Sequence, residues 1–141
     1  MKYFTIEELC QSQPATRLGL DNTPPPEVKE SLEALVENIL DPLRTLIGRP
    51  ITVSSGYRSK ALNHRIGGSP TSQHVLGEAA DINCHSIGTR ELFNRIRTSP
   101  LPFDQLIFEG TWVHVSYGPR NRRQVLYAKF NNGRVTYSSH E

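Results

Sequence analysis

The sequence of 141 residues predicts an α+β fold, in which a small antiparallel sheet is flanked by helices. Two observations carry this prediction. The strongest helical periodicity lies in the first third of the chain, whereas short segments typical of strands dominate the remainder. The last two of these segments flank Asn132-Gly133, a dipeptide that favours a tight antiparallel hairpin. The length fits one ordinary domain, so we expect a single domain over residues 1–141.

The first elements are helices. A capping box that starts at Thr5 predicts a short helix, and residues 11–26 then read as a loop that ends in three prolines. The clearest helix covers residues 28–47, where apolar residues recur at spacings of three and four. Pro42 is expected to kink or interrupt this helix, and Gly48 is expected to end it. Its role is to pack the core.

After this helix the periodicity changes to that of short strands. We expect strands at residues 51–54, 79–83, 105–109, 112–117, 125–130 and 134–137. Two further helices are expected at residues 59–66 and 89–98. No internal repeat or low-complexity segment interrupts this order.

The composition excludes several classes of protein. Hydrophobic residues make up 36% of the chain, which is enough for one core and argues against disorder. Sixteen basic and fourteen acidic residues leave a charge of +2, too weak an excess to indicate a nucleic-acid partner. No apolar run approaches the roughly 20 residues of a membrane span, so we expect no membrane insertion. The two cysteines make no disulfide framework.

Three side chains that can bind a metal lie beside turns or on expected strands. His74 follows a loop, Asp81 lies in the strand 79–83, and His114 lies in the strand 112–117. Because side chains alternate along a strand, Asp81 and His114 can converge if the two strands are neighbours, and His74 can reach them from its loop. Two imidazoles and one carboxylate are a typical set of zinc ligands that leaves a fourth position for water.

Each of these residues also has a structural interpretation. A histidine between valines on a strand is often a structural residue that is hydrogen-bonded to its surroundings, and an aspartate such as Asp81 can simply cap a turn. The other histidines, His64, His85 and His140, have no comparable setting, and we interpret them as surface or structural residues.

A longer pattern surrounds the first two candidates. Residues 72–81 read SQHVLGEAAD and match the signature S-x-H-x-x-G-x-A-x-D of the M15 zinc peptidases, the D-Ala-D-Ala carboxypeptidase-like family. Upstream, SGYRS at residues 55–59 is followed by Leu62-Asn63 and resembles another stretch of that family. Within the signature, Gly77 is expected to permit a tight backbone course.

The resemblance continues downstream of the signature. The segments FDQLI at residues 103–107 and WVHVS at residues 112–116 resemble the third-ligand region of the M15A-like branch. The similarity runs from about residue 28 to residue 118 and so covers most of the chain. The ten-residue signature together with WVHVS is highly specific, whereas SGYRS alone would be weak.

The resemblance implies a fold like that of the hedgehog and D-Ala-D-Ala peptidase domains, with one zinc ion per chain bound by His74, Asp81 and His114. It implies a peptidoglycan peptide as substrate, cut by a D-Ala-D-Ala carboxypeptidase or by a cell-wall endopeptidase of the endolysin type. It also implies synthesis in the cytoplasm and action at the cell wall. The first residues lack the apolar stretch of a Sec signal peptide, which fits a phage-encoded enzyme released through a separately made pore.

Substrate-binding residues follow from the same resemblance. Arg58 has the position of the family's arginine that holds carbonyl or carboxylate groups of the substrate, a task that suits a guanidinium. The alternative is that Arg58 fixes its own loop through backbone carbonyls. Ser72 and Gln73 are expected to line the site through hydrogen bonds.

The general base is where the sequence departs from the family. Many members place Glu or Asp three residues before the last histidine ligand, and Thr111 has that position here. Glu109 is the nearest carboxylate and could act as base and then acid, or it could be a solvated turn residue. Asp104 is a weaker substitute. Without a base, the chain would be a zinc-containing binding module for cell wall or protein with the same fold, as the hedgehog domains suggest.

The remaining basic cluster, Arg120 to Arg123, is a third candidate site. We interpret it as a solvated connection between strands and expect no nucleic acid as a partner. The sequence does not indicate an oligomeric state.

Overall fold

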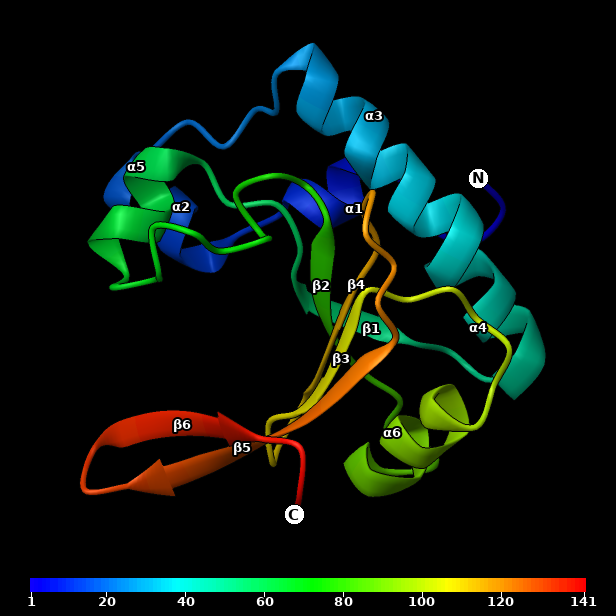
Figure 1. Ribbon diagram of the computed structural model, residues 1–141. Coiled ribbons are helices and arrows are strands. Elements are labelled where there is room, and N and C mark those ends of the chain that lie inside the picture. The colour runs from blue at the N-terminus through cyan, green and yellow to red at the C-terminus, as the bar shows by residue number, and fades with distance from the viewer.

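The computed structural model describes residues 1–141 and has a six-stranded sheet at its centre, with the strand order β1-β2-β4-β3-β5-β6 (Figure 1). The helices are α1 (Ile6–Cys10), α2 (Gln13–Leu18), α3 (Pro26–Leu35), the π-helical turn η1 (Val36–Leu40), α4 (Asp41–Ile47), α5 (Lys60–Arg65) and α6 (Thr89–Arg97). The strands are β1 (Thr52–Ser55), β2 (Ala79–Asn83), β3 (Gln105–Phe108), β4 (Val113–Ser116), β5 (Gln124–Asn131) and β6 (Arg134–Ser138). The α+β prediction is therefore confirmed.

The sheet is mixed rather than wholly antiparallel. Four neighbouring pairs are antiparallel, as expected, but β3 and β5 run parallel. The connection after β4 returns the chain to the start of β3, where Arg123 N–H donates to the Phe103 carbonyl and Gln124 N–H to the Asp104 carbonyl. The chain thus enters β5 in the same direction as β3, which the turn signals of the sequence did not indicate.

The N-terminal helices depend on side-chain caps. Thr5 Oγ1 accepts a hydrogen bond from Glu8 N–H at 3.1 Å, so the predicted start of α1 is confirmed. The prediction of a continuous loop over residues 11–26 is wrong, because α2 forms within it. Ser12 Oγ accepts from Ala15 N–H at 3.2 Å, and Gly19 ends the helix with φ of 66°.

The helical segment continues past Pro42, because α3, η1 and α4 follow one another directly. The five-residue turn η1 lies between α3 and α4, so the expected interruption takes the form of a π-helical turn. Proline lacks the N–H that an α-helix needs, and a wider turn accommodates the missing bond. Gly48 ends α4 with φ of 70°, as predicted.

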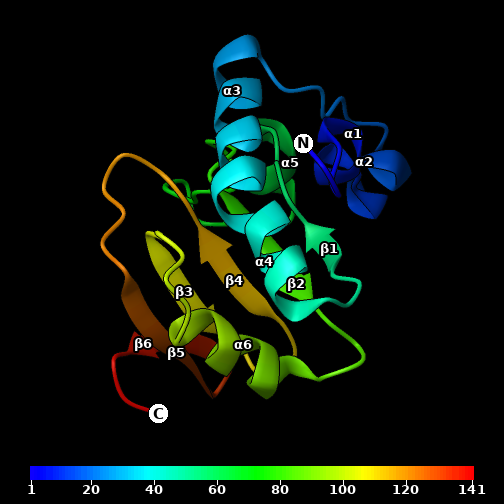
Figure 2. The same ribbon diagram turned by 90° about the vertical axis from the view of Figure 1, so that its right-hand side faces the viewer.

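The two faces of the sheet differ. Figure 2 shows α3, α4 and α6 in front of one face, where they enclose the hydrophobic core with buried strand residues such as Ile82, Leu106, Val113 and Val115. The alternate residues of the same strands point to the opposite face, on which Asp81 and His114 lie. No helix has both the length and the apolar character that crossing a membrane requires.

Candidate metal centre

Three side chains converge on the face of the sheet opposite α3 and α4. Asp81 on β2 pairs with His114 on β4, and His74 reaches them from the loop between α5 and β2. Asp81 Oδ1 lies 3.2 Å from His74 Nε2 and 3.2 Å from His114 Nδ1. One ligand atom from each residue lies within 4.8 Å of the others. The structure therefore brings together the three residues that the sequence selected as metal ligands.

The second nitrogen of each imidazole is held by a neighbour. His74 Nδ1 lies 2.7 Å from the Gly56 carbonyl oxygen, which can only accept a hydrogen bond, so Nδ1 carries the proton. His114 Nε2 faces Gln73 Oε1 at 3.5 Å, which favours the proton on Nε2. The lone pairs of His74 Nε2 and His114 Nδ1 consequently face the Asp81 carboxylate. This orientation is the one that metal-binding histidines need.

The donor set fits a zinc ion. In these tautomers two nitrogen lone pairs and a carboxylate oxygen meet, and such electron-rich atoms repel one another unless a cation lies between them. Zinc binds this combination of ligands and leaves a fourth position open in catalytic sites. His74, Asp81 and His114 would hold the ion.

Asp81 is prepared to act as an anionic ligand. Burial alone raises the pKa of its carboxyl, but with protons rather than a metal between the imidazoles and Oδ1, hydrogen bonds and charge from His114 and His74 outweigh burial and hold the pKa well below the ordinary value. The carboxylate is therefore ionised throughout the neutral range.

Two glycines shape the backbone around His74. A Cβ on Gly56 would lie 2.2 Å from the Leu9 carbonyl oxygen, so only glycine allows α1 to approach the segment that holds His74 Nδ1. Gly77 has φ of 71°, and a Cβ there would lie 2.8 Å from the Val28 side chain. The expected tight backbone course at Gly77 is confirmed.

A buried carboxylate supports Gln73 beneath His114. Gln73 Nε2 donates to Asp104 Oδ2 at 2.8 Å, and Arg122 Nε donates to Asp104 Oδ1 at 2.8 Å. The Arg122 hydrogen bond is the main cause that lowers the pKa of Asp104 to about 2, and only 1% of Asp104 is exposed. Both ends of the Gln73 amide are therefore engaged within the protein, which makes it a residue that orients His114. Asp104 is likewise unavailable as the substitute base.

Arg58 lies on the other side of His74. Its backbone N–H donates to the His74 carbonyl at 3.1 Å, and its Nη2 donates to Ser72 Oγ at 3.1 Å. Ser72 Oγ also accepts from His74 N–H at 3.2 Å, so Ser72 ties the arginine to the loop that carries His74. The guanidinium makes no hydrogen bond to a backbone carbonyl, and its buried Nε has no partner in the protein. Burial lowers the pKa of Arg58, and the Asp81 charge opposes this effect.

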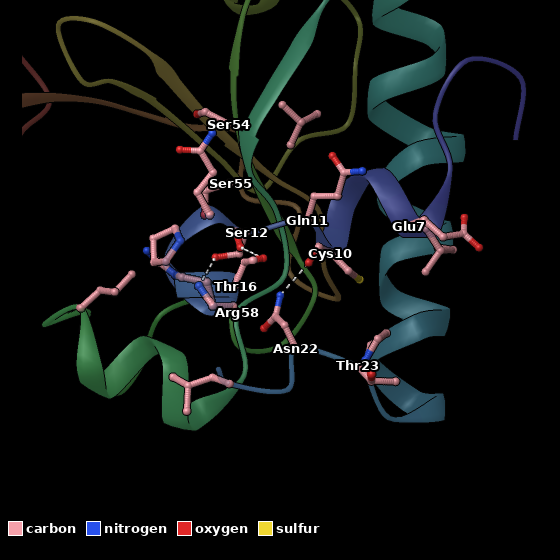
Figure 3. Close-up of a pocket in the computed structure, with 18 of the residues that line it drawn as sticks. Glu7, Cys10, Gln11, Ser12, Thr16, Asn22, Thr23, Ser54, Ser55 and Arg58 are labelled. Carbon is pink, nitrogen blue, oxygen red and sulfur yellow. Dashed lines mark hydrogen bonds between the residues drawn. The ribbon is translucent and has the colours of Figure 1, made fainter. Parts of the chain in front are cut away.

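A cavity of about 1470 Å³ adjoins Arg58 (Figure 3). It lies between β1 and the segment that contains α1 and α2, and Ser54, Ser55 and Ser12 contribute polar groups to its wall. None of the three metal-capable residues lines it. Since Ser55 is the register partner of Asp81, the cavity lies beside the metal centre rather than over it, with Arg58 at the border.

Glu109 directly follows β3 and shares the face of the metal centre. Ile107 is the register partner of His114, and Glu109 lies two residues further along the same strand direction. Its backbone N–H donates to the Trp112 carbonyl at 3.1 Å, which continues the pairing of β3 with β4. Burial is the main cause that raises the pKa of Glu109, with the His114 charge opposing and the Asp81 charge adding to it. The side chain of Thr111, in contrast, is exposed at the turn.

The basic cluster after β4 serves the interior of the protein. Arg122 binds Asp104, and Arg123 donates to the carbonyls of Leu101 and Ser99. Both arginines are exposed, as expected of a solvated connection, but they also bind groups of the protein interior. An available signal was Asp104 itself, because an aspartate within an apolar segment needs a cationic or hydrogen-bonding partner once it is buried.

Comparison with known proteins identifies a family for the chain. A family model described as Peptidase M15 matches residues 2–116. A zinc D-Ala-D-Ala carboxypeptidase from Streptomyces albus G is 42% identical over 50 residues. That alignment covers 35% of this chain and 20% of the relative, so the chain aligns with about a fifth of the relative's length.

Proposed function

Because the chain belongs to the peptidase M15 family, we propose that it is a zinc-dependent peptidase that hydrolyses amide bonds in peptidoglycan peptides. The observation that carries this proposal is the convergence of His74 Nε2, Asp81 Oδ1 and His114 Nδ1. Gly56 and Gln73 hold the far side of each imidazole, so the lone pairs are oriented before any metal binds. One zinc ion per chain would be bound there.

The proposed reaction combines this centre with Glu109. Zinc in such a site supplies a Lewis acid that polarises a carbonyl and activates water at neutral pH. In this proposal Glu109 takes a proton from the attacking water and then delivers it to the leaving amine. Its position on the face of His114 and its raised pKa both suit this exchange, because a base with a pKa closer to neutrality also serves as the acid.

Arg58 is proposed to bind the substrate. Within the protein only Nη2 of its half-buried guanidinium has a hydrogen-bond partner, and a charged group of this kind binds a carboxylate or a carbonyl oxygen strongly. A substrate that ends in a carboxylate, as D-Ala-D-Ala does, would place this group against Arg58. Ser72 would keep the guanidinium in position through its hydrogen bond to Nη2. The proposed substrate locates the action of the enzyme at the cell wall.

Digestion of purified peptidoglycan tests the proposal and identifies the bond. The protein is incubated with zinc and peptidoglycan, and the released fragments are identified by mass spectrometry. Loss of a terminal D-Ala would assign a carboxypeptidase, whereas cleavage at an internal amide would assign an endopeptidase. His74→Ala should abolish release, and His64→Ala, which changes an exposed histidine of α5, should not. Equal release by wild type and His74→Ala would refute the proposal.

A further inference from the structure

The outer part of the hairpin of β5 and β6 carries apolar side chains on one face only. Register pairs Ala128 with Tyr137 and Phe130 with Val135, and alternation puts Leu126 on the same side. We refer to these residues, Leu126, Ala128, Phe130, Val135 and Tyr137, as the apolar hairpin face. Polar residues occupy the outer part of the opposite side: Lys129, Asn131, Arg134 and Thr136.

The apolar hairpin face and the metal centre lie on the same side of the sheet. Leu126 is the register partner of Ile107, Ile107 is that of His114, and His114 is that of Asp81. Residues directly opposite one another on neighbouring strands point to the same face. In Figure 1 the hairpin projects from the sheet on the side away from α3, α4 and α6.

One contact and the strand register bring this face to the proposed base. A Cβ built on Gly110 would lie 3.9 Å from Phe130 Cε2, so the phenyl ring lies next to the turn that follows Glu109. Phe108 is the register partner of Tyr127, so the next residues, Glu109 and Ala128, lie at the same level, and Tyr137 is the register partner of Ala128. The apolar hairpin face therefore begins at the level of the proposed base and extends outward from it.

Nothing in the chain covers the outer part of this face. Phe130 is 64% exposed, Val135 44% and Tyr137 49%, and none of the five residues belongs to the hydrophobic core. The hairpin contributes to the core from its other side, where Tyr127 packs against Phe93 of α6. An antiparallel pair usually turns its apolar side toward the interior. Here the apolar hairpin face is exposed and extends outward from a candidate active site, which is typical of a binding surface.

The order of the strands places the apolar hairpin face and Arg58 on opposite sides of the metal centre. Arg58 follows β1 at one edge of the sheet, the metal-capable residues lie on and beside β2 and β4, and the hairpin forms the other edge. A peptide that crosses the centre would thus meet a cation at one end and an uncharged apolar surface at the other. Its carboxylate would be attracted to Arg58, and an uncharged segment would lie on the hairpin.

We propose that the apolar hairpin face binds the uncharged part of the substrate peptide on the side of the cleaved bond away from Arg58, with Tyr137 as a positioning residue. This inference rests on the proposed peptidase function. Alanine methyl groups and aliphatic side chains of the peptide would pack on Phe130, Val135 and the ring of Tyr137. The phenol hydroxyl would form a hydrogen bond to a peptide group. The hairpin follows the residues that the family model matches, so it would adapt the centre to a substrate of this chain.

Steady-state kinetics on two substrates test this proposal. The first is a muropeptide from peptidoglycan that wild type cleaves, and the second is a blocked short peptide that contains only the two residues of the cleaved bond. Tyr137→Ala and Phe130→Ala should each raise KM for the muropeptide about tenfold, with kcat nearly unchanged, because both remove contacts that the substrate makes equally in the ground state and in the transition state. Neither should alter KM for the short peptide more than about twofold.

Matched variants separate the possible outcomes. Thr136→Ala, beside Tyr137 but on the opposite side of β6, should leave both values of KM unchanged, and thermal unfolding verifies that every variant is folded. Tyr137→Phe measures the hydroxyl alone and should have a smaller effect than Tyr137→Ala. Wild-type turnover with unchanged KM in both alanine variants would overturn this inference alone. It would equally be overturned if the variants instead dissociated a dimer in sedimentation, whereas wild type without any turnover would overturn the proposed function as well.

Discussion

Asp81 on β2 lies directly opposite His114 on β4, with Asp81 Oδ1 3.2 Å from His114 Nδ1. The register of two hydrogen-bonded strands fixes this relationship, and a slip by one residue would turn one of the side chains into the core. Two of the three metal-capable residues are thus held by the sheet itself. Only His74 depends on a loop, and Gly56 and Arg58 fix that loop by hydrogen bonds to its imidazole and its carbonyl.

Replacement of Glu109 by Gln tests the assignment of the base. The amide keeps the size of the side chain but cannot accept the proton, so kcat should fall by about 10²- to 10⁴-fold while zinc content stays unchanged. Glu30→Gln on the exposed side of α3 serves as the control and should keep full activity. Full activity of Glu109→Gln would show that another group is the base. Zinc-loaded wild type that never turns over would favour the non-catalytic binding module.

Replacement of Arg58 tests its role in substrate binding. Arg58→Ala removes a charged hydrogen-bond donor, which is expected to lower kcat/KM about 10- to 100-fold for a substrate with a free terminal carboxylate. For the same substrate with an amidated terminus, Arg58→Ala should lower kcat/KM much less. Arg65→Ala on α5 removes an exposed arginine and should not change kcat/KM for either substrate. Equal losses for both substrates would argue that Arg58 does not bind the carboxylate.

Gln73 is expected to control metal affinity through His114. Gln73→Leu removes the oxygen that faces His114 Nε2, so the imidazole loses the partner that fixes its orientation. Zinc affinity, measured by competition with a chelator, should fall about 10- to 100-fold. Gln124→Leu, a change at an exposed position of β5, should leave the affinity unchanged. Unaltered affinity in Gln73→Leu would mean that His114 is positioned without this contact.

Asp104 links stability to pH. Its pKa of about 2 in the folded protein lies below the ordinary value near 4, so its contribution to the free energy of unfolding is complete above about pH 4 and is lost as the pH falls toward about 2. Asp104→Asn should lower the free energy of unfolding by about 2 kcal/mol at neutral pH. Denaturant titrations of both proteins should show this difference shrinking between about pH 4 and pH 2. A difference that stays constant over this range would contradict the assignment of the Asp104–Arg122 pair.

Local signals account for what the sequence predicted well. The cap at Thr5, the apolar spacing of α3 and α4 and the Asn132-Gly133 turn act within a few residues, and the structure has the corresponding elements. The alternation along β2 and β4 likewise indicated that Asp81 and His114 could face one another. Only the pairing of the two strands had to be supplied by the fold.

The features that escaped prediction depend on partners far apart in the chain or on weak local signals. The parallel pair of β3 and β5 depends on the returning connection, and the role of Arg122 depends on Asp104, 18 residues earlier. The contacts of Gln73 with Asp104 and His114 could not be placed from spacing alone. Helix α2 was not predicted because it has only six residues, contains a proline, and is indicated only by the serine cap at its start and by Gly19 at its end.

The location of bound zinc tests the central claim most directly. Crystals of the zinc-loaded protein would be measured at the zinc absorption edge, where anomalous scattering locates the ion without reference to the protein coordinates. The account predicts one strong peak per chain, about 2.0–2.2 Å from His74 Nε2, His114 Nδ1 and an oxygen of Asp81. A zinc ion bound elsewhere, or no peak at these three residues in fully loaded protein, would contradict it.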